Sequence, residues 1–299
     1  MKNTIFTGAG VAIVTPMNAD GSINYDELGR LIDFNIENGT DAIIICGTTG
    51  ESSTMTDEEH IECIRYAVEK TAGRVPVIAG TGSNHTEYAV NLSKKAEELG
   101  ADALLCVTPY YNKTSQKGLV AHFTAIANAV KIPIILYNVP SRTGTNIQPK
   151  TAYELSKVEN IVALKAASGN ISQIMETAHL CQGQLDIYSG NDDQIVPIMA
   201  IGGKGVISVL SNCVPKETHE ITQLCLENKF DEATKLAFRY LPLAHALFND
   251  VNPIPVKEAL NIMGFKAGEC RMPLIRSEEA KIEELRKALD DLGLVGCIK

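Results

Sequence analysis

Eight short apolar segments recur along this chain, and their starts lie 20 to 33 residues apart. Each segment is continuously apolar rather than alternating with polar residues, which is typical of strands buried on both faces of a parallel sheet. The interval leaves room for a strand, a loop and a helix in each unit. The predicted strands are Gly10–Pro16, Ala42–Gly47, Val75–Gly80, Ala103–Pro109, Pro133–Asn138, Ile161–Lys165, Leu185–Gly190 and Gly205–Leu210.

Helical signals lie between these segments. The stretch from Thr56 to Glu59 has the pattern of a capping box ahead of an amphipathic segment. A second helical pattern runs from Thr86 to Leu99 and is followed by Gly100, a residue typical of helix C-termini. Pro149 begins another, because proline is tolerated in the first turn of a helix. Strands and helices therefore alternate along the chain.

Eight alternating strands and helices predict an α/β fold of the (β/α)8 TIM barrel type. A doubly wound sheet is the main alternative, but no Gly-x-Gly-x-x-Gly follows the first strand. After about residue 214 the pattern is helical only, which predicts a C-terminal helical extension. We predict a barrel catalytic domain at residues 1–228 and a helical region at residues 229–299. The helices expected beyond residue 214 are Pro215–Asn228, Phe230–Phe248, Pro255–Met263 and Ser277–Leu292.

The formal net charge of −9 argues against nucleic acid and against an anionic membrane surface as partners. No apolar run approaches the roughly 18 residues of a membrane span, and the N-terminus lacks the apolar core of a signal peptide. The eight cysteines are dispersed without a Cys-x-x-Cys pair, so we interpret them as reduced core thiols of a cytoplasmic protein. No cluster of His, Asp or Glu suggests a metal site, and we expect neither a metal nor a cofactor.

Lys165 ends the apolar run that begins at Ile161. A dry site disfavours the ammonium form of lysine, and the neutral amine is the nucleophile that forms Schiff bases with carbonyl substrates. The plain alternative is a strand-end lysine whose ammonium reaches water, and this would be the better interpretation of a lone lysine. The polar residues at the ends of the neighbouring strands instead favour the interpretation of Lys165 as a nucleophile.

The active site of a (β/α)8 barrel lies at the C-terminal ends of its strands. There Lys165 would attack the ketone of a small 2-oxo acid, while threonine hydroxyls and backbone N–H groups hold its carboxylate. A tyrosine would move protons during imine and enamine formation, and Arg142 would bind a second carboxylate bidentately. The segments in which strands two, four, five and seven end are Gly47-Thr48-Thr49-Gly50-Glu51, Thr108-Pro109-Tyr110-Tyr111-Asn112, Tyr137-Asn138-Val139-Pro140-Ser141-Arg142 and Ser189-Gly190-Asn191-Asp192.

Each of these residues also has a purely structural interpretation. The threonine pair suits a tight turn, Tyr110 and Tyr111 suit packing at the rim, and Arg142 suits a solvated loop. Glu51 and Asp192 fit caps or loops better than acid catalysis, and none of the six histidines pairs obviously with a nucleophile. The joint placement of the polar residues on one rim favours the catalytic interpretation.

The chain resembles the dihydrodipicolinate synthase (4-hydroxy-tetrahydrodipicolinate synthase) family over essentially its whole length. The resemblance implies a Schiff-base-forming lyase that condenses pyruvate with L-aspartate 4-semialdehyde to 4-hydroxy-tetrahydrodipicolinate, in lysine and diaminopimelate biosynthesis. It also implies a homotetramer built as a dimer of dimers. The motifs that carry the resemblance are Gly47-Thr48-Thr49-Gly50-Glu51, Val107-Thr108-Pro109-Tyr110-Tyr111, Tyr137-Asn138-Val139-Pro140-Ser141-Arg142, Lys165, Gly205-Val206-Ile207-Ser208 and Asn252-Pro253-Ile254-Pro255-Val256-Lys257.

The resemblance implies roles for eight residues. Lys165 matches the Schiff-base lysine and Tyr137 the general acid and base. Thr48 and Tyr111 complete a proton relay, with Tyr111 reaching in from a neighbouring subunit. The implied substrate contacts are Thr49 with the pyruvate carboxylate, Arg142 with the semialdehyde carboxylate, and backbone groups of Gly190 and Ile207 lining the pocket.

The chain departs from the family pattern in two places. Ala166 follows the lysine where members commonly carry an acidic residue, so the local field at the imine is expected to differ. The feedback pocket for lysine is incomplete, because Asp57 stands in place of a histidine and Tyr88 in place of a glutamate that pairs with the effector's ammonium. A buried ammonium without a counter-charge is disfavoured, so we expect weak or absent inhibition by lysine.

Two alternatives stay open at this point. Another class I pyruvate lyase, such as an N-acetylneuraminate or 2-keto-3-deoxy-sugar-acid lyase, would also use Lys165 and Tyr137. Sugar-acid lyases that resemble this fold tend to lack an arginine like Arg142, which favours the small charged aldehyde. A catalytically idle barrel that binds a 2-oxo acid is the second alternative, although binding alone needs no nucleophile.

Overall fold

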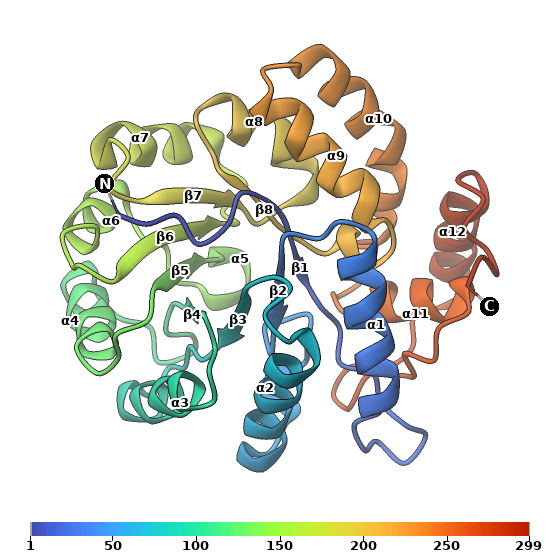
Figure 1. The fold of residues 1–299 in the computed structure, drawn as a ribbon, viewed down its shortest axis with the longest axis horizontal. Coiled ribbons are helices and arrows are strands. Elements are labelled where there is room, and N and C mark those ends of the chain that lie inside the picture. Colours follow the sequence, from blue (N-terminus) through green and yellow to red (C-terminus); the bar gives the residue numbers. More distant parts are fainter. Residues whose placement is uncertain (1, 299) are drawn as a thin grey trace.

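The computed structural model describes residues 2–298 and has the predicted (β/α)8 TIM barrel fold. Eight parallel strands close into a barrel in which each strand pairs with the next and β8 pairs with β1. Helices surround the strands on all sides, as Figure 1 shows. The strands are β1 Gly8–Ala12, β2 Ala42–Ile45, β3 Val77–Gly80, β4 Ala103–Val107, β5 Ile134–Asn138, β6 Ile161–Ala166, β7 Asp186–Ser189 and β8 Gly205–Ser208.

The predicted helix signals lie at helix ends. Thr56 and Glu59 form the capping box of α2, and Pro149 is the first residue of α6. The helices are α1 Tyr25–Glu37, α2 Asp57–Thr71, α3 Thr86–Glu98, α4 Gln116–Ala127, α5 Pro140–Thr143, α6 Pro149–Leu155, α7 Ile171–Cys181, α8 Ile195–Ala200, α9 Pro215–Leu226, α10 Phe230–Ala246, α11 Ile254–Met263 and α12 Glu279–Asp290, with short 3-10 helices η1 Ser52–Thr54, η2 Asp192–Gln194 and η3 Leu210–Asn212.

The first strand lies earlier in the chain than predicted. β1 begins at Gly8, which pairs with Gly205 of β8, and a Cβ on Gly205 would lie 1.9 Å from the Gly8 carbonyl oxygen. The strand ends at Ala12, and the Val14 amide donates to the side-chain oxygen of Asn212 instead of to a neighbouring strand. Ile13 still donates from its amide to the Ile44 carbonyl oxygen of β2 at 3.2 Å, and the apolar residues after it are buried at the rim without extending the sheet.

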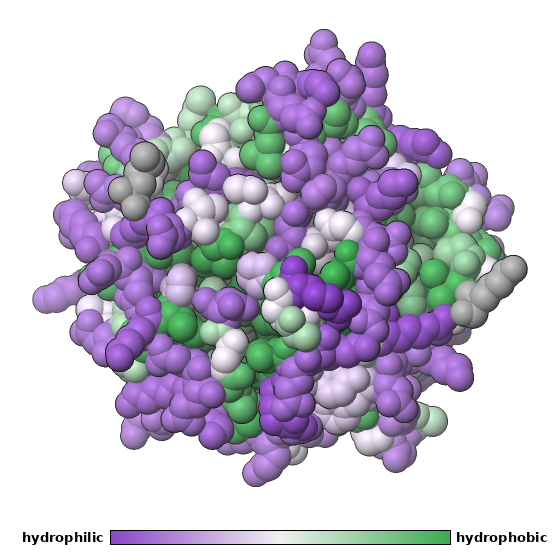
Figure 2. Space-filling model, in the orientation of Figure 1, coloured by the Kyte–Doolittle hydropathy of each residue, from purple (hydrophilic) through white to green (hydrophobic). Residues whose placement is uncertain are grey.

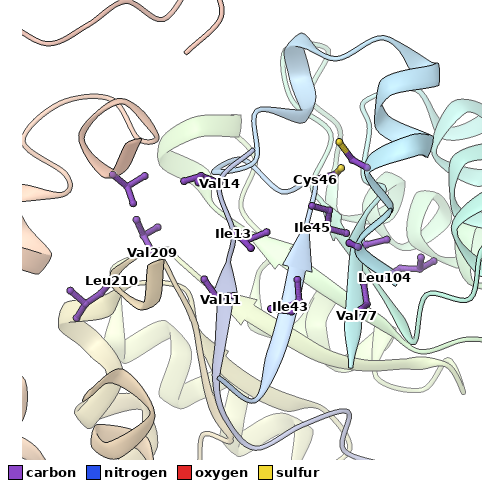
Figure 3. Packing of buried hydrophobic residues seen from close by; sticks show 14 of the residues in the cluster. Val11, Ile13, Val14, Ile43, Ile45, Cys46, Val77, Leu104, Val209 and Leu210 are labelled. Carbon is purple, nitrogen blue, oxygen red and sulfur yellow. The ribbon is translucent and has the colours of Figure 1, made fainter. Parts of the chain in front are cut away.

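Two layers of apolar side chains hold the barrel together. Ile44, Ile78 and Ile135 belong to the cluster that fills the interior. Their neighbours along each strand point the other way and pack under the helices, as Figure 3 shows for Ile43 and Ile45. Both faces of the strands are thus buried, which is why the sequence shows continuous apolar runs.

The N-terminal segment closes one end of the barrel. In Figure 1 this segment, in dark blue, crosses the face of the barrel before it enters β1. The Phe6 ring stacks on Tyr188 of β7 with 4.4 Å between ring centroids, and the Tyr188 hydroxyl donates to the Phe6 carbonyl oxygen at 2.6 Å. The segment thus covers the end of the barrel at which the strands have their N-termini, and the opposite end, with the C-termini of the strands, is not covered by it.

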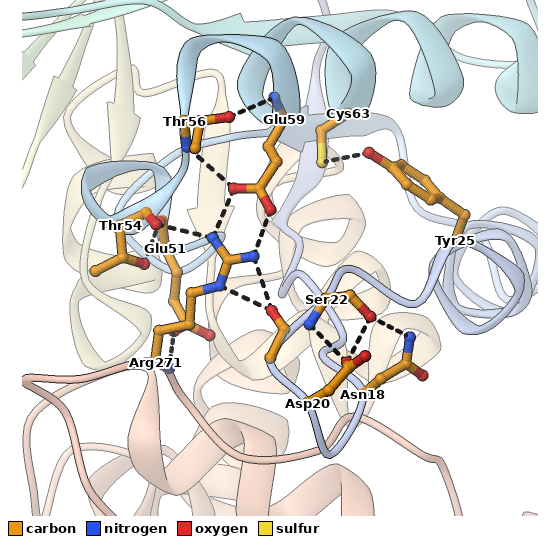
Figure 4. A network of polar contacts seen from close by, with 11 residues as sticks. Asn18, Asp20, Ser22, Tyr25, Glu51, Thr54, Thr56, Glu59, Cys63 and Arg271 are labelled. Atoms are coloured by element: carbon orange, nitrogen blue, oxygen red, sulfur yellow. Dashed lines mark hydrogen bonds and ion pairs between the residues drawn. The ribbon is translucent and has the colours of Figure 1, made fainter.

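The chain beyond α9 folds back onto the barrel. Helix α10 packs against α8, α9 and α12, and α11 packs against α12. Arg271, which follows α11, donates to both carboxylate oxygens of Glu59 in α2 at 2.6 and 2.5 Å, and to the Gly21 carbonyl oxygen (Figure 4). The segment after residue 228 thus contributes directly to the rim of the barrel. The predicted division into two parts at residue 228 stays a proposal that rests on the sequence pattern.

The surface is mainly polar. Figure 2 shows hydrophilic side chains over most of one face, with apolar ones gathered nearer the centre of the barrel. Asp and Glu outnumber Lys and Arg by 36 to 27, so this polar surface carries a net negative charge. None of the helices within residues 2–298 combines the length and apolar character needed to cross a membrane.

Candidate active site

Lys165 and Tyr137 lie side by side inside the barrel. They face one another across the pairing of β5 and β6, and each is one residue from the C-terminal end of its strand. The Lys165 Nζ atom is 4.3 Å from the centroid of the Tyr137 ring. The two residues are 6% and 7% exposed, respectively. An amine and a phenol thus lie side by side at a buried position, an arrangement suited to imine formation with proton transfer.

Ala166 faces away from this pocket. Successive side chains along a strand point to opposite faces, so Ala166 lies on the outer face of β6. It packs with Ile174 of α7, Ile187 of β7 and Ile198 of α8. An acidic residue at this position would lie in the apolar layer behind the strand. The structure therefore gives no direct contact through which Ala166 would act on an imine at Lys165.

The residues after β2 form a tight turn at the same end of the barrel. The Gly50 amide donates to the Gly47 carbonyl oxygen and the Glu51 amide to that of Thr48, both at 3.1 Å. Glu51 closes the turn with a φ of 58°, in the left-handed region. Over the described residues 2–298, the amides of Thr48 and Thr49 have no carbonyl acceptor. The turn therefore offers two backbone N–H donors to an anion.

A buried ion pair fixes this turn to the C-terminal region. Lys257 Nζ lies 2.8 Å from Glu51 Oε1, and both side chains are 1% exposed. Lys257 also donates to the carbonyl oxygens of Thr15 and Glu269, while the Glu51 carboxylate accepts the Arg271 amide at 2.9 Å. Glu51 is thus the anchor of the turn. The sequence could suggest only a cap or loop role, because Lys257 is 206 positions away.

Asn252 connects two of the predicted substrate-binding residues. Its Nδ2 atom donates to Thr49 Oγ1 at 3.0 Å, and its backbone carbonyl oxygen accepts from Arg142 Nη2 at 3.3 Å. Asn252 and Thr49 are buried, whereas Arg142 in α5 is exposed at the mouth of the site. The sequence places Asn252 only within a motif and indicates neither contact, since its partners lie 203 and 110 positions away.

Asp192 organises the rim after β7 and β8. Its carboxylate accepts the Ser208 hydroxyl at 2.5 Å and the amides of Val209 and Leu210 at 3.1 and 2.9 Å. Burial raises the pKa of Asp192, and the hydrogen bonds from Ser208 and the two amides, together with the charge of Lys165, oppose the rise. These contacts hold the segment after β8 against β7, in agreement with the loop role predicted for Asp192.

Gly190 and Ile207 also lie at the ends of β7 and β8. The Gly190 amide donates to the Ala166 carbonyl oxygen at 2.8 Å, and a Cβ on Gly190 would lie 2.7 Å from the Ala167 Cβ. A larger residue at Gly190 would therefore displace the segment after β6. Ile207 is fully buried in β8. Their predicted backbone contacts with a substrate stay a prediction.

Tyr111 lies outside the site of its own chain. Its side chain is 93% exposed, and its φ of 66° turns the backbone outward after β4. Thr48, by contrast, lies in the turn after β2, at the same rim as Lys165 and Tyr137. One chain therefore assembles the amine, a phenol and the threonine turn on a single rim, but leaves the Tyr111 phenol in solvent.

The acidic, histidine and cysteine side chains are dispersed. Within the described residues, no group of three or more His, Cys, Asp or Glu side chains could hold a metal ion. All eight cysteines are free and six of them are buried. Cys270 is half-buried and Cys297 is exposed, so the prediction of core thiols is wrong for Cys297, which lies beyond α12 near the C-terminus.

Comparison with known proteins gives full-length matches. Residues 5–292 match the family model described as the Dihydrodipicolinate synthetase family. A curated 4-hydroxy-tetrahydrodipicolinate synthase from Lachnoclostridium phytofermentans is 61% identical over 292 residues, which cover 97% of this chain and 99% of that relative.

Solved structures give the same result in three dimensions. A dihydrodipicolinate synthase from Acinetobacter baumannii, complexed with pyruvate, is 43% identical with a TM-score of 0.96, and the match covers 98% of this chain and 100% of that one. A dihydrodipicolinate synthase from Aquifex aeolicus is 45% identical with a TM-score of 0.95, over 97% of this chain and 99% of that one. Because these matches span the barrel and almost all of the helical extension, the chain belongs to the dihydrodipicolinate synthetase family.

Proposed function

We propose that this chain condenses pyruvate with L-aspartate 4-semialdehyde to give 4-hydroxy-tetrahydrodipicolinate, on the route to lysine and diaminopimelate. The observation that carries the proposal is the buried Lys165 amine beside the Tyr137 phenol at the C-terminal rim of the barrel. Membership of the family, with 61% identity to a 4-hydroxy-tetrahydrodipicolinate synthase, selects this reaction over the sugar-acid lyases that would use the same pair.

The proposed chemistry begins with the Lys165 amine attacking the ketone carbon of pyruvate. The resulting carbinolamine loses water to form an imine, and loss of a methyl proton converts the imine into an enamine. The enamine carbon then attacks the aldehyde carbon of the semialdehyde, whose oxygen takes up a proton. The amino group of the semialdehyde finally attacks the imine carbon, closes the ring and expels the Lys165 amine, so that one water is released overall.

We assign the proton transfers to Tyr137, which lies next to the Lys165 amine. Thr48 would continue the relay from the turn after β2, and Tyr111 would complete it from a neighbouring subunit. The 93% exposure of Tyr111 in the single chain supports this assignment, because a phenol facing solvent is free to enter another chain's site. The same argument supports an assembly of at least two chains, which we propose to be a homotetramer built as a dimer of dimers.

The two substrate carboxylates need separate positions. Thr49 and the amides of Thr48 and Thr49 suit the pyruvate carboxylate, because they present a hydroxyl and backbone N–H donors at one turn. Arg142 suits the semialdehyde carboxylate, because it lies at the exposed mouth and its guanidinium can bind bidentately. Backbone groups of Gly190 and Ile207 would line the pocket between them. A cytoplasmic location also stays a proposal, supported by the eight free cysteines.

The purified protein should consume pyruvate only when L-aspartate 4-semialdehyde is present. This result follows because the enamine needs an aldehyde acceptor before carbon–carbon bond formation can proceed. The measurement is pyruvate loss with and without the semialdehyde, with N-acetylneuraminate cleavage measured in parallel. Consumption without the semialdehyde, or cleavage of the sugar acid at a higher kcat/KM, would refute the proposed substrate pair. A protein that consumes no pyruvate and cleaves no sugar acid would favour the alternative of a catalytically idle barrel that binds a 2-oxo acid.

Lysine should inhibit this enzyme weakly, with a dissociation constant above about 1 mM. The Tyr88 hydroxyl donates to Asp57 Oδ1 at 2.7 Å. Burial, and next the hydrogen bond to Asp57, raise the pKa of Tyr88 to about 12, so this position carries a neutral phenol at pH 7. A lysine ammonium would lack the glutamate carboxylate at position 88, and the exposed Asp57 carboxylate already accepts the Tyr88 hydroxyl.

Initial rates over a lysine titration would measure this inhibition. Tyr88→Glu supplies the missing carboxylate and serves as the matched variant, which should bind lysine more tightly than the unchanged protein. Inhibition of the unchanged protein at micromolar lysine would show that another group compensates the ammonium.

A further inference from the structure

We propose that Asn252 is a positioning residue that turns the Thr49 hydroxyl into a hydrogen-bond donor toward the pyruvate carboxylate. The inference rests on the proposed function, and it assigns a task to a residue of the C-terminal region that lies outside the predicted site. Asn252 follows α10 and reaches the turn after β2 across 203 positions of the chain. It is 4% exposed, so this contact is shielded from water.

The hydrogen bond between the two side chains sets the direction of the hydroxyl. Asn252 Nδ2 donates to Thr49 Oγ1 at 3.0 Å, and within residues 2–298 this hydroxyl has no other partner. A hydroxyl has one proton and can accept as well as donate. Because Oγ1 already accepts from the amide, its proton is left for another acceptor. A carboxylate, which only accepts hydrogen bonds, suits that proton.

The other end of the Asn252 amide makes no hydrogen bond to the described chain. The Oδ1 atom is buried and has no hydrogen-bond partner among the described residues. The contact with Thr49 is therefore the one side-chain hydrogen bond that orients this amide. If the amide were turned over, Oδ1 would accept the Thr49 proton, and the hydroxyl would present lone pairs to the incoming carboxylate.

The backbone of Asn252 contacts Arg142, the residue predicted to bind the semialdehyde carboxylate. Its backbone carbonyl oxygen accepts from Arg142 Nη2 at 3.3 Å. A change of side chain leaves this carbonyl in place. The two contacts can therefore be separated by experiment: the side chain acts on the pyruvate position through Thr49, and the backbone acts on the semialdehyde position through Arg142.

Steady-state kinetics of two Asn252 variants would test the proposal. Asn252→Ala removes the donor and should raise the KM for pyruvate roughly 3- to 10-fold. Asn252→Asp keeps the shape but accepts the Thr49 proton and adds a negative charge, so the KM for pyruvate should rise roughly 30-fold or more. In both variants the KM for the semialdehyde should change by less than about twofold and kcat by less than about threefold, because the backbone carbonyl and Lys165 are untouched.

Asn261→Ala is the matched control. Asn261 lies in the same C-terminal region, where its side chain exchanges two hydrogen bonds with the backbone of Gly268 and contacts no predicted site residue. Its replacement should lower the melting temperature and leave both KM values unchanged. A general loosening of the C-terminal region would instead make Asn261→Ala and Asn252→Ala behave alike.

A double-mutant cycle with Thr49→Val tests whether Asn252 acts through Thr49. The valine removes the hydroxyl, so adding Asn252→Ala should raise the KM for pyruvate no further. Additive effects, equal effects of alanine and aspartate at position 252, or equal rises in both KM values would overturn the proposal. An unchanged KM for pyruvate in Thr49→Val alone would also overturn it, even if the Asn252 variants do not fold. Semialdehyde-dependent consumption of pyruvate by the unchanged protein tests the proposed function separately.

Discussion

Lys165→Ala should reduce turnover by roughly 1000-fold or more, because it removes the amine that lies beside Tyr137 and would form the imine. The neighbouring Tyr137 would still be present, but a proton donor cannot replace the nucleophile. Turnover is measured as semialdehyde-dependent loss of pyruvate. Reduction with borohydride in the presence of pyruvate supplies a second readout, since it converts an imine on Lys165 into a stable adduct that mass spectrometry can locate.

Lys204→Ala is the control for this experiment. Lys204 directly precedes β8, at the opposite end of the barrel, so its loss should leave turnover and the adduct unchanged. The Lys165 variant should retain the circular-dichroism spectrum of the unchanged protein, because the aliphatic part of the Lys165 side chain contributes only local packing. Near-full activity of a folded Lys165→Ala protein would refute the imine mechanism.

Lys257→Met should lower the free energy of unfolding by about 3–5 kcal/mol, since it leaves the Glu51 carboxylate buried without its counter-charge. Lys257 and Glu51 are each 1% exposed and 2.8 Å apart. The Glu51 carboxylate would keep the amide of Arg271 as a donor, but one neutral hydrogen bond does not compensate a buried charge. Denaturant unfolding at one fixed protein concentration would measure the loss.

The double variant Glu51→Gln/Lys257→Met removes both charges and should recover most of this loss, to within about 2 kcal/mol of the unchanged protein. Lys95→Met provides a surface comparison, because the pair of Lys95 and Glu98 is exposed and worth less than about 1 kcal/mol. If Lys257→Met were no more destabilising than Lys95→Met, the pair would not be the anchor of the turn after β2.

The sequence was sufficient for the barrel because strand burial leaves a local pattern. Each strand is covered on both faces, so its residues are apolar without interruption and its position can be predicted from a few neighbours. The rule that catalytic residues follow the strands then placed Lys165, Tyr137 and Thr49 on one rim. The predicted start of the first strand, Gly10, was wrong. The strand begins at Gly8 because of its contact with Gly205, which is far away in the chain.

The supporting contacts of the site could not be predicted in this way. Asn252 and Lys257 lie in the helical extension, and no local pattern indicates that they touch Thr49 and Glu51 in the turn after β2. The sequence shows the motif that contains them, but it does not show which residues they contact. The position of Tyr111 depends on a surface outside its own chain, so neither its sequence neighbours nor the single chain locates its partner.

The anchoring of Glu51 by Arg271 also bears on how the chain is made. These two residues are 220 positions apart. At synthesis rates of about 5–20 residues per second, the ribosome needs roughly 10 to 45 s between them. During that time the turn after β2 lacks the hydrogen bond from the Arg271 amide. The contacts that hold this turn can therefore form only near the end of translation, and a chain cut short before α11 would lack both Lys257 and Arg271 as partners of Glu51.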